Sequence, residues 1–150
     1  MGDGTRHEVE VLTSVSDEDA ADLRHLLGLL STTAVFDRAR IESMVAHDAT
    51  EMLIVRERGR IVGMTTVVTF PLPTGIRGIV EDVAVHESMR GKGIARLLLQ
   101  RATLLAREHG LRTLDLTSRP SREAALRLYE SVGFVRRDTN VLRYAPDAVS

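Results

Sequence analysis

The chain lacks cysteine and is poor in aromatic residues. None of its 150 residues is cysteine, so disulfides, zinc sites of the cysteine type and thiol nucleophiles are all excluded. Any group transfer must therefore use another route. Aromatic residues make up 3% of the chain, which leaves no stacking platform for single-stranded nucleic acid.

The chain also lacks an excess of charge and a long apolar run. Its 20 basic and 21 acidic residues give a net charge of -1, so nothing favours a polyanion, and we expect no nucleic-acid partner. No apolar run approaches the roughly 20 residues that span a bilayer. The first residues have no apolar core for a signal peptide, and Arg6 stands where a myristoylation signal needs Ser or Thr. We expect a cytoplasmic protein without a membrane partner.

The length and composition suit one compact domain. A chain of 150 residues, 43% hydrophobic and 27% charged, can bury one core. We therefore predict a single domain over residues 1–150.

Periodicity in the first half predicts two helices and three strands. Residues 8–13 alternate like a half-buried strand, and Ser16 with Asp19 forms a capping box. The helix that follows has its apolar stripe at Ala20, Leu23, Leu27 and Leu30, and a weaker helix is expected near 36–47. Strands 52–57 and 61–70 are joined by a hairpin through Gly59, and Pro71 and Pro73 end the second of them.

The second half predicts an alternation of strands and helices. Strand 79–85 leads into a glycine-containing segment and then a long helix, which ends at Gly110. The apolar stripe of that helix is expected at Ile94, Leu97, Leu98, Leu104 and Leu105. Strand 111–117, a short helix stopped by Gly133, and closing strands 134–137 and 139–144 complete an α/β fold.

The segment Arg90-Gly91-Lys92-Gly93-Ile94-Ala95 has the form of a phosphate site. A strand, a short glycine turn and a helix aim free N–H groups and a helix dipole at an anion, and the two basic side chains add positive charge. A plain strand-to-helix turn with two solvated cations fits the spacing equally well. The Walker pattern is excluded because Gly93 follows Lys92, and the dinucleotide fingerprint because Arg96 stands where a small residue is needed.

Two blocks of sequence resemble one family. Val83-Ala84-Val85, four residues and then the segment Arg90 to Ala95 resemble motif A of the GNAT (Gcn5-related) N-acetyltransferases, and residues 125–134 resemble its motif B. Together the blocks cover roughly residues 79–137. The resemblance implies a mixed, mostly antiparallel central sheet flanked by about four helices. It also implies transfer of an acetyl group from acetyl-CoA to a primary amine, without an acyl-enzyme or a metal.

The resemblance implies a cofactor site as well. Pantetheine would lie between strands 79–85 and 111–117, bound by the backbone of Val83 and Val85. The pyrophosphate would rest on the segment that contains Arg90, Gly91, Lys92, Gly93, Ile94 and Ala95. Strand 79–85 also resembles that of glucosamine-phosphate acetyltransferases. Where the family often has Asn, seven residues before the motif B tyrosine, this chain has Arg122.

Three side chains are candidates for catalysis or substrate binding. Tyr129 could protonate the departing thiolate or simply pack on its helix stripe. Strand alternation puts Glu81 on the face shared with Val83 and Val85, and Asp82 on the opposite face. A carboxylate buried there is costly unless paired, so Glu81 is either a general base or salt-bridged, while Asp82 binds substrate or is structural.

Other functions stay open at the level of sequence. The rivals are a noncatalytic acyl-CoA-binding module and a regulatory domain that binds nucleotide phosphates. The five histidines show no spacing that sets two of them on one helix face, so no metal site is expected. His86 lines the cofactor mouth or is a solvated loop residue. No motif identifies the acceptor amine, and homodimers are common in the family.

Overall fold

The computed structural model describes residues 6–147. Its elements follow the predicted order as far as the last helix, and the α/β class is confirmed. They are β1 (Val9–Val11), α1 (Asp17–Leu30), α2 (Arg38–Val45), β2 (Thr50–Glu57), β3 (Arg60–Leu72), β4 (Gly75–Val85), the 3-10 turn η1 (Glu87–Met89), α3 (Ile94–Glu108), β5 (Thr113–Asp115) and α4 (Glu123–Val132).

The five strands form one mixed sheet in the order β1-β2-β3-β4-β5. All neighbours are antiparallel except β4 and β5, which run parallel because α3 carries the chain back between them. The prediction that Pro71 and Pro73 end the strand at residue 70 is wrong. β3 continues to Leu72, with Pro71 opposite Ile76, because a proline is tolerated near the end of a strand where no ladder bond is lost.

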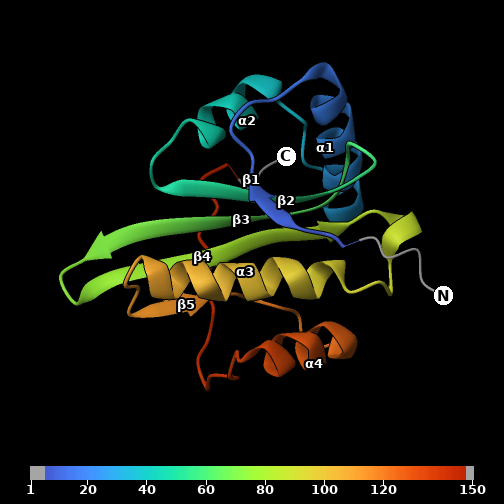
Figure 1. The fold of residues 1–150 in the computed structure, drawn as a ribbon. Helices are drawn as coiled ribbons and strands as arrows, with labels where there is room; N and C mark the ends of the chain where they lie inside the picture. The colour runs from blue at the N-terminus through green and yellow to red at the C-terminus, as the bar shows by residue number, and fades with distance from the viewer. Residues whose placement is uncertain (1–5, 148–150) are drawn as a thin grey trace.

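Helices cover both faces of the sheet (Figure 1): α1 and α2 lie on one face, α3 and α4 on the other. Alternate residues of β2 enter the two cores, with Leu53 and Val55 facing α3 and Met52 and Ile54 facing α1. α3 approaches very closely at Gly63, where a Cβ would lie 2.5 Å from Cγ2 of Ile94. This glycine fixes the start of α3 against the centre of the sheet.

Two predicted helix stripes need correction. In α1 the buried apolar residues are Ala20, Leu23 and Leu26, whereas Leu30 is 37% exposed. In α3 Leu99 and Ala102 are buried, and Leu104 is 46% exposed. Both errors have one cause: several leucines in a row offer two overlapping stripes, and only the packing of the helix on the sheet selects between them.

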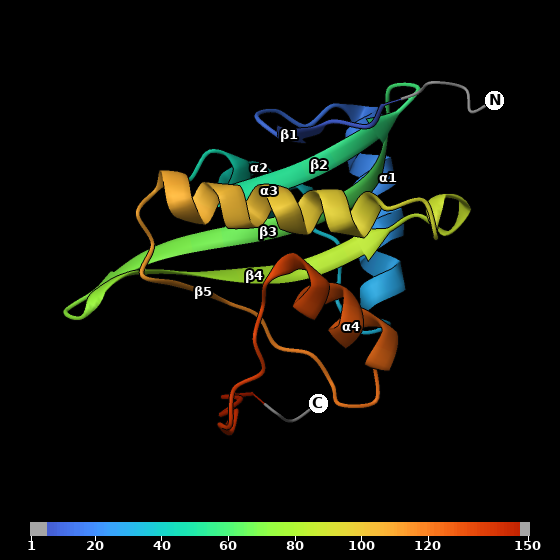
Figure 2. The same ribbon diagram turned by 60° about the horizontal axis from the view of Figure 1, so that its bottom comes forward.

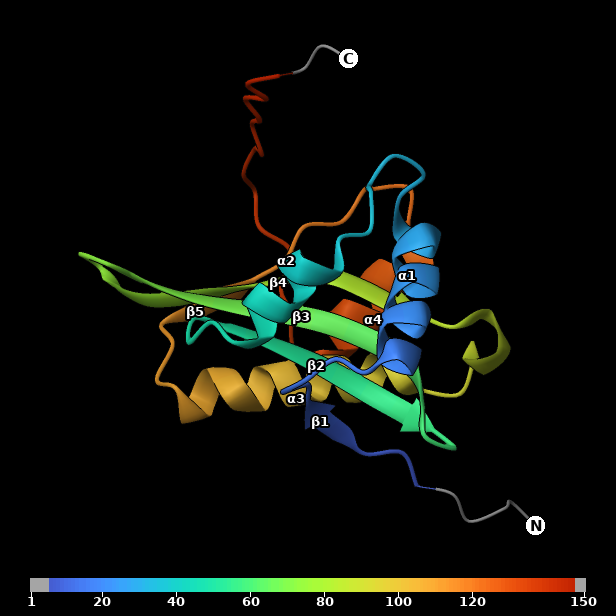
Figure 3. The same ribbon diagram turned by 90° about the horizontal axis from the view of Figure 1, so that it is seen from above.

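The predicted closing strands at 134–137 and 139–144 are also wrong. Within residues 6–147 the sheet ends at β5, and the segment after Phe134 leaves it without regular structure (Figure 3). Tyr144, expected to pack on a terminal strand, is 87% exposed. Strand propensity is insufficient without a partner strand of adequate length, and β5, the last strand of the sheet, has only three residues. No helix among the described residues has the length and apolar character to cross a membrane.

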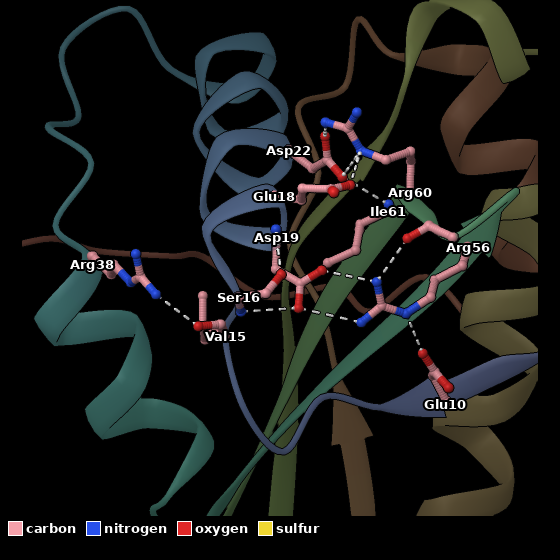
Figure 4. A network of polar contacts seen from close by, with 11 residues as sticks. Glu10, Val15, Ser16, Glu18, Asp19, Asp22, Arg38, Arg56, Arg60 and Ile61 are labelled. Carbon is pink, nitrogen blue, oxygen red and sulfur yellow. Dashed lines mark hydrogen bonds and ion pairs between the residues drawn. The ribbon is translucent and has the colours of Figure 1, made fainter.

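A polar network fastens α1 to the sheet edge (Figure 4). The predicted capping box is present: the Ser16 hydroxyl accepts from the Asp19 N–H and the Asp19 carboxylate accepts from the Ser16 N–H. Arg56 of β2 donates to the same carboxylate at 2.8 and 3.3 Å and to Glu10 at 2.6 Å. Arg60 and the Ile61 N–H bind Asp22 in the same way. Four elements therefore meet at the start of α1.

The ion pair between the buried Asp19 and the half-buried Arg56 makes stability depend on pH. The hydrogen bonds from Arg56 hold the pKa of the Asp19 carboxyl below its ordinary value, so the pair stabilises the fold above the unfolded-state pKa and this contribution is lost as pH falls through the folded-state pKa. We predict that Asp19→Asn lowers the free energy of unfolding by about 1–3 kcal/mol at pH 7. The deficit should shrink in denaturation curves at pH 3. Asp17→Asn, at an exposed pair with Arg38, is the control, and an equal loss there would contradict this account.

Candidate active site

The centre of the site is an irregularity in β4. Met64 of β3 lies opposite Ala84 and Thr66 opposite Glu81, so β4 contains one residue more than β3 over this stretch. The extra residue is accommodated by Asp82, whose φ is +58°, in the left-handed region that Asp tolerates better than most residues. The buried Thr65 hydroxyl donates to the Glu81 carbonyl at 2.9 Å. It satisfies a group that the interrupted ladder leaves free.

Because of the bulge, the predicted assignment of Glu81 and Asp82 to the two faces of the sheet is wrong. Val80 lies in the core under α3, and so do Val83 and Val85, although an unbroken strand would put Val80 on the opposite face from them. Glu81 thus shares the α1 face with Ala84, not the face of Val83 and Val85. Both Glu81 and Asp82 are exposed. The predicted cost of burying a carboxylate in mid-strand therefore does not arise.

Past the bulge, β4 has an open edge. β5 pairs with β4 only from Arg77 to Ile79, and beyond that point the chain turns away and α4 lies beside the end of β4 (Figure 2). The His86 N–H bonds the Val62 carbonyl at 2.8 Å. Because peptide groups alternate along a strand, those of Val85 and Val83 point away from β3, toward the gap. An extended ligand could pair there as an added strand.

The glycine segment leads from this edge into α3. Gly91 and Gly93 have φ of +78° and +81°, and a Cβ on either would have open space around it. Gly93 is the N-cap of α3 and has no side chain with which to cap it, so the first N–H groups of the helix stay available for an anion. The helix cannot shift, because Ile94 is 1% exposed against Gly63.

The open edge and the glycine segment border one cavity of about 370 Å³. It is lined by Leu29 and Leu30 of α1, Val83, Ala84 and Val85 of β4, Arg90, Ala95 of α3, and Arg122, Ala125, Leu128 and Tyr129 at and within α4. Five predicted site residues thus lie together: Val83, Val85, Arg90, Ala95 and Tyr129. Six others do not line the cavity: Glu81, Asp82, Gly91, Lys92, Gly93 and Ile94.

Tyr129 both packs and lines the cavity. Its side chain is 8% exposed, and its ring meets Phe134 edge-on with 6.5 Å between centroids. Packing of the ring is therefore confirmed, and because the same side chain reaches the cavity, its expected role as proton donor stays a prediction. Arg122 is exposed and lines the same cavity, so the residue that departs from the family pattern lies at the site.

Three residues of the site gave no usable signal in the sequence. Leu29 and Leu30 lie at the end of α1, off its buried stripe. Periodicity wrongly assigned Leu30 to that stripe and gave Leu29 no role. Thr65 supports the bulge from a neighbouring strand. Its role depends on strand register, which a single sequence does not reveal.

Comparison with known proteins identifies the family to which this fold belongs. The model of the Acetyltransferase (GNAT) family matches residues 17–134. The chain belongs to this family, as the motifs of residues 79–137 indicated.

Relatives cover the chain to different extents. A mycothiol acetyltransferase of Thermomonospora curvata is 32% identical over 99 residues, which are 66% of this chain and 32% of that protein. The chain thus corresponds to about a third of that relative. An uncharacterised N-acetyltransferase of Bacillus subtilis, YdgE, is 26% identical, with 89% of this chain and 90% of that one aligned.

A solved structure shows the same fold with coenzyme A. The aminoglycoside N-acetyltransferase AAC(6′)-Iy, solved in complex with CoA, superposes with a TM-score of 0.79 over 97% of this chain and 99% of its own, at 15% identity. At that identity the likeness concerns the fold.

Two glycines with the same backbone conformation allow a matched test of the glycine segment. Gly93 and Gly59 have φ of +81° and +80°, and an added methyl group would meet open space at both. Replacing either glycine with alanine should therefore lower the free energy of unfolding by a similar amount, about 1 kcal/mol. We predict that acetyl-CoA raises the Tm of wild type and Gly59→Ala strongly, that of Gly93→Ala weakly, and that ATP and NAD shift none of them. Equal shifts in both variants, or with ATP, would refute this placement of the pyrophosphate.

Proposed function

We propose that the chain is an acetyl-CoA-dependent N-acetyltransferase that acetylates a primary amine of a small molecule or peptide by direct attack on the thioester. One observation carries the proposal: the open edge of β4 and the two ends of the glycine segment, Arg90 and Ala95, border one cavity, which Tyr129 also lines. Pantetheine can pair with an open strand edge and a diphosphate can bind at a helix N-terminus.

Different groups of the chain would bind different parts of acetyl-CoA. The peptide groups of Val83 and Val85 would pair with the pantetheine amides. The N–H groups from Gly91 to Ala95 would receive the diphosphate, with Arg90 and Lys92 adding charge. A Val83 N–H near the thioester would polarise its carbonyl as negative charge develops on the oxygen.

Two side chains would handle protons. As the amine nitrogen bonds to the carbonyl carbon and the carbon–sulfur bond breaks, Tyr129 would give its proton to the leaving thiolate. A base is needed because an amine of pKa near 10 is mostly protonated at neutral pH. Glu81 would take this proton, directly or through a water, and the second proton, lost from the nitrogen as the amide forms, would restore the Tyr129 hydroxyl. Asp82 beside Glu81 would bind the substrate. Both lie at the bulge, with Glu81 on the sheet face toward α1, from which the acceptor would then approach.

The position of Glu81 also favours a second candidate. Because Glu81 does not line the cavity, a noncatalytic acyl-CoA-binding module fits the same geometry, with an intact cofactor site and no base in reach. Turnover separates the two functions. As to the acceptor, relatives are named for mycothiol and for glucosamine 6-phosphate and a structural neighbour for a ribosomal-protein alanine, so the amine panel should contain both small amines and peptides.

Replacing Tyr129 with Phe keeps the ring packed on Phe134 and removes only the hydroxyl. We predict that turnover falls about 10- to 1000-fold while the affinity for acetyl-CoA changes little, as expected for a lost general acid. The release of CoA from a panel of amines can be followed with a thiol reagent, since the chain has no cysteine to react.

Tyr144→Phe, at a tyrosine that is 87% exposed, is the control for the loss of a phenol. Full activity of Tyr129→Phe would assign Tyr129 to packing alone. Acetyl-CoA binding without turnover of any amine by the wild type would favour the noncatalytic module.

A further inference from the structure

Three potential metal ligands meet where α1 approaches the turn that precedes the glycine segment. His25 comes from α1, and His86 and Glu87 lie between β4 and Arg90. One ligand atom from each lies within 4.8 Å of the other two. His25 and Glu87 are 62 positions apart in sequence, so the spacing of the histidines could not predict the cluster.

The contacts within the cluster converge on one carboxylate oxygen. Oε1 of Glu87 lies 2.6 Å from Nε2 of His25 and 3.6 Å from Nδ1 of His86. The two imidazole rings stack with 4.8 Å between centroids and 26° between planes. Two nitrogens and one oxygen from three side chains thus lie within 4.8 Å of one another, and imidazole nitrogen and carboxylate oxygen are ligands typical of zinc.

To hold an ion, the ligand atoms, which now lie 2.6 Å to at most 4.8 Å apart, must take up the spacing of a tetrahedral site. Ligand atoms around a tetrahedral Zn²⁺ lie about 3.4 Å apart, given bonds of about 2.0–2.2 Å. The side chains of His25, His86 and Glu87 are 48%, 38% and 47% exposed, so they can rotate and water can complete the coordination. An ion at Nδ1 of His86 would replace the hydrogen bonds from the Ser88 N–H and hydroxyl, at 3.1 and 2.9 Å. Ser88 is exposed, so both of its groups can bond water instead.

We propose that His25, His86 and Glu87 form a binding site for a divalent transition-metal ion, with Zn²⁺ as the ion that suits the two imidazoles and one carboxylate best. The ion would link α1, which ends at the cavity with Leu29 and Leu30, to the turn that leads into Arg90. It would act as a structural clamp beside the cofactor segment. Neither the transfer reaction nor the proposed proton donor depends on it.

The chain contains a matched control for this site. His109 and Glu51 form another exposed pair, also with 2.6 Å between Nε2 and Oε1, but the described residues bring no third ligand to it. If Zn²⁺ affinity falls on substitution in the cluster but not on substitution of His109, binding requires the three-residue cluster and not merely a histidine–carboxylate pair.

The test is a Zn²⁺ titration of the tag-free protein, in competition with a metal-sensing dye. We expect one equivalent of Zn²⁺ to bind to the wild type and to His109→Gln with equal affinity. The affinity of His25→Gln and of Glu87→Gln should be lower by about 10- to 100-fold. The Tm rise with Zn²⁺ should follow the same order.

The metal-free Tm of each variant shows that it folds, and the two cluster variants provide independent readings should one of them be unstable. Binding to His25→Gln and Glu87→Gln as tight as to the wild type would overturn the proposal. So would an equal loss in His109→Gln, or no binding to the wild type.

Discussion

The site depends on β4 losing its neighbour partway along its length. β5 pairs with β4 for three residues and then departs, while β4 continues to Val85. Backbone N–H and C=O groups in a sheet are normally paired, so the unpaired stretch offers ready hydrogen bonds to an extended ligand. The bulge at Asp82 sits at this departure. It brings Val80, Val83 and Val85 to one face and leaves Glu81 on the other.

The second constraint is the anchoring of α3. Ile94 is seated where Gly63 leaves no Cβ, which fixes the first turn of the helix against the strand beside β4. The glycine segment can thus present its N–H groups from a rigid support while Arg90 to Gly93 stay exposed. The network around Asp19 and Arg56 anchors α1 in the same sense, and α1 closes the far side of the cavity.

Local features were predictable from sequence and register was not. The Ser16–Asp19 capping box, the turn at Gly59 and the glycine segment each depend on a few adjacent residues, and all three are present. The bulge depends on Thr65 reaching Glu81 from another strand, so simple alternation assigned Glu81 to the wrong face. The closing strands failed because β propensity says nothing about whether a neighbouring strand is long enough to pair with, and β5 has only three residues. The His25–His86–Glu87 cluster could not be predicted from the sequence either, because only the fold brings its members together.

Amide hydrogen exchange at β4 tests the central claim most directly. In the free protein the Ala84 N–H, which points toward β3, should exchange slowly, and those of Val83 and Val85, which face the gap, should exchange fast. Saturating acetyl-CoA should slow Val83 and Val85 markedly and change Ala84 little. If acetyl-CoA binds and these two amides remain as fast as before, the open edge of β4 is not where the cofactor lies.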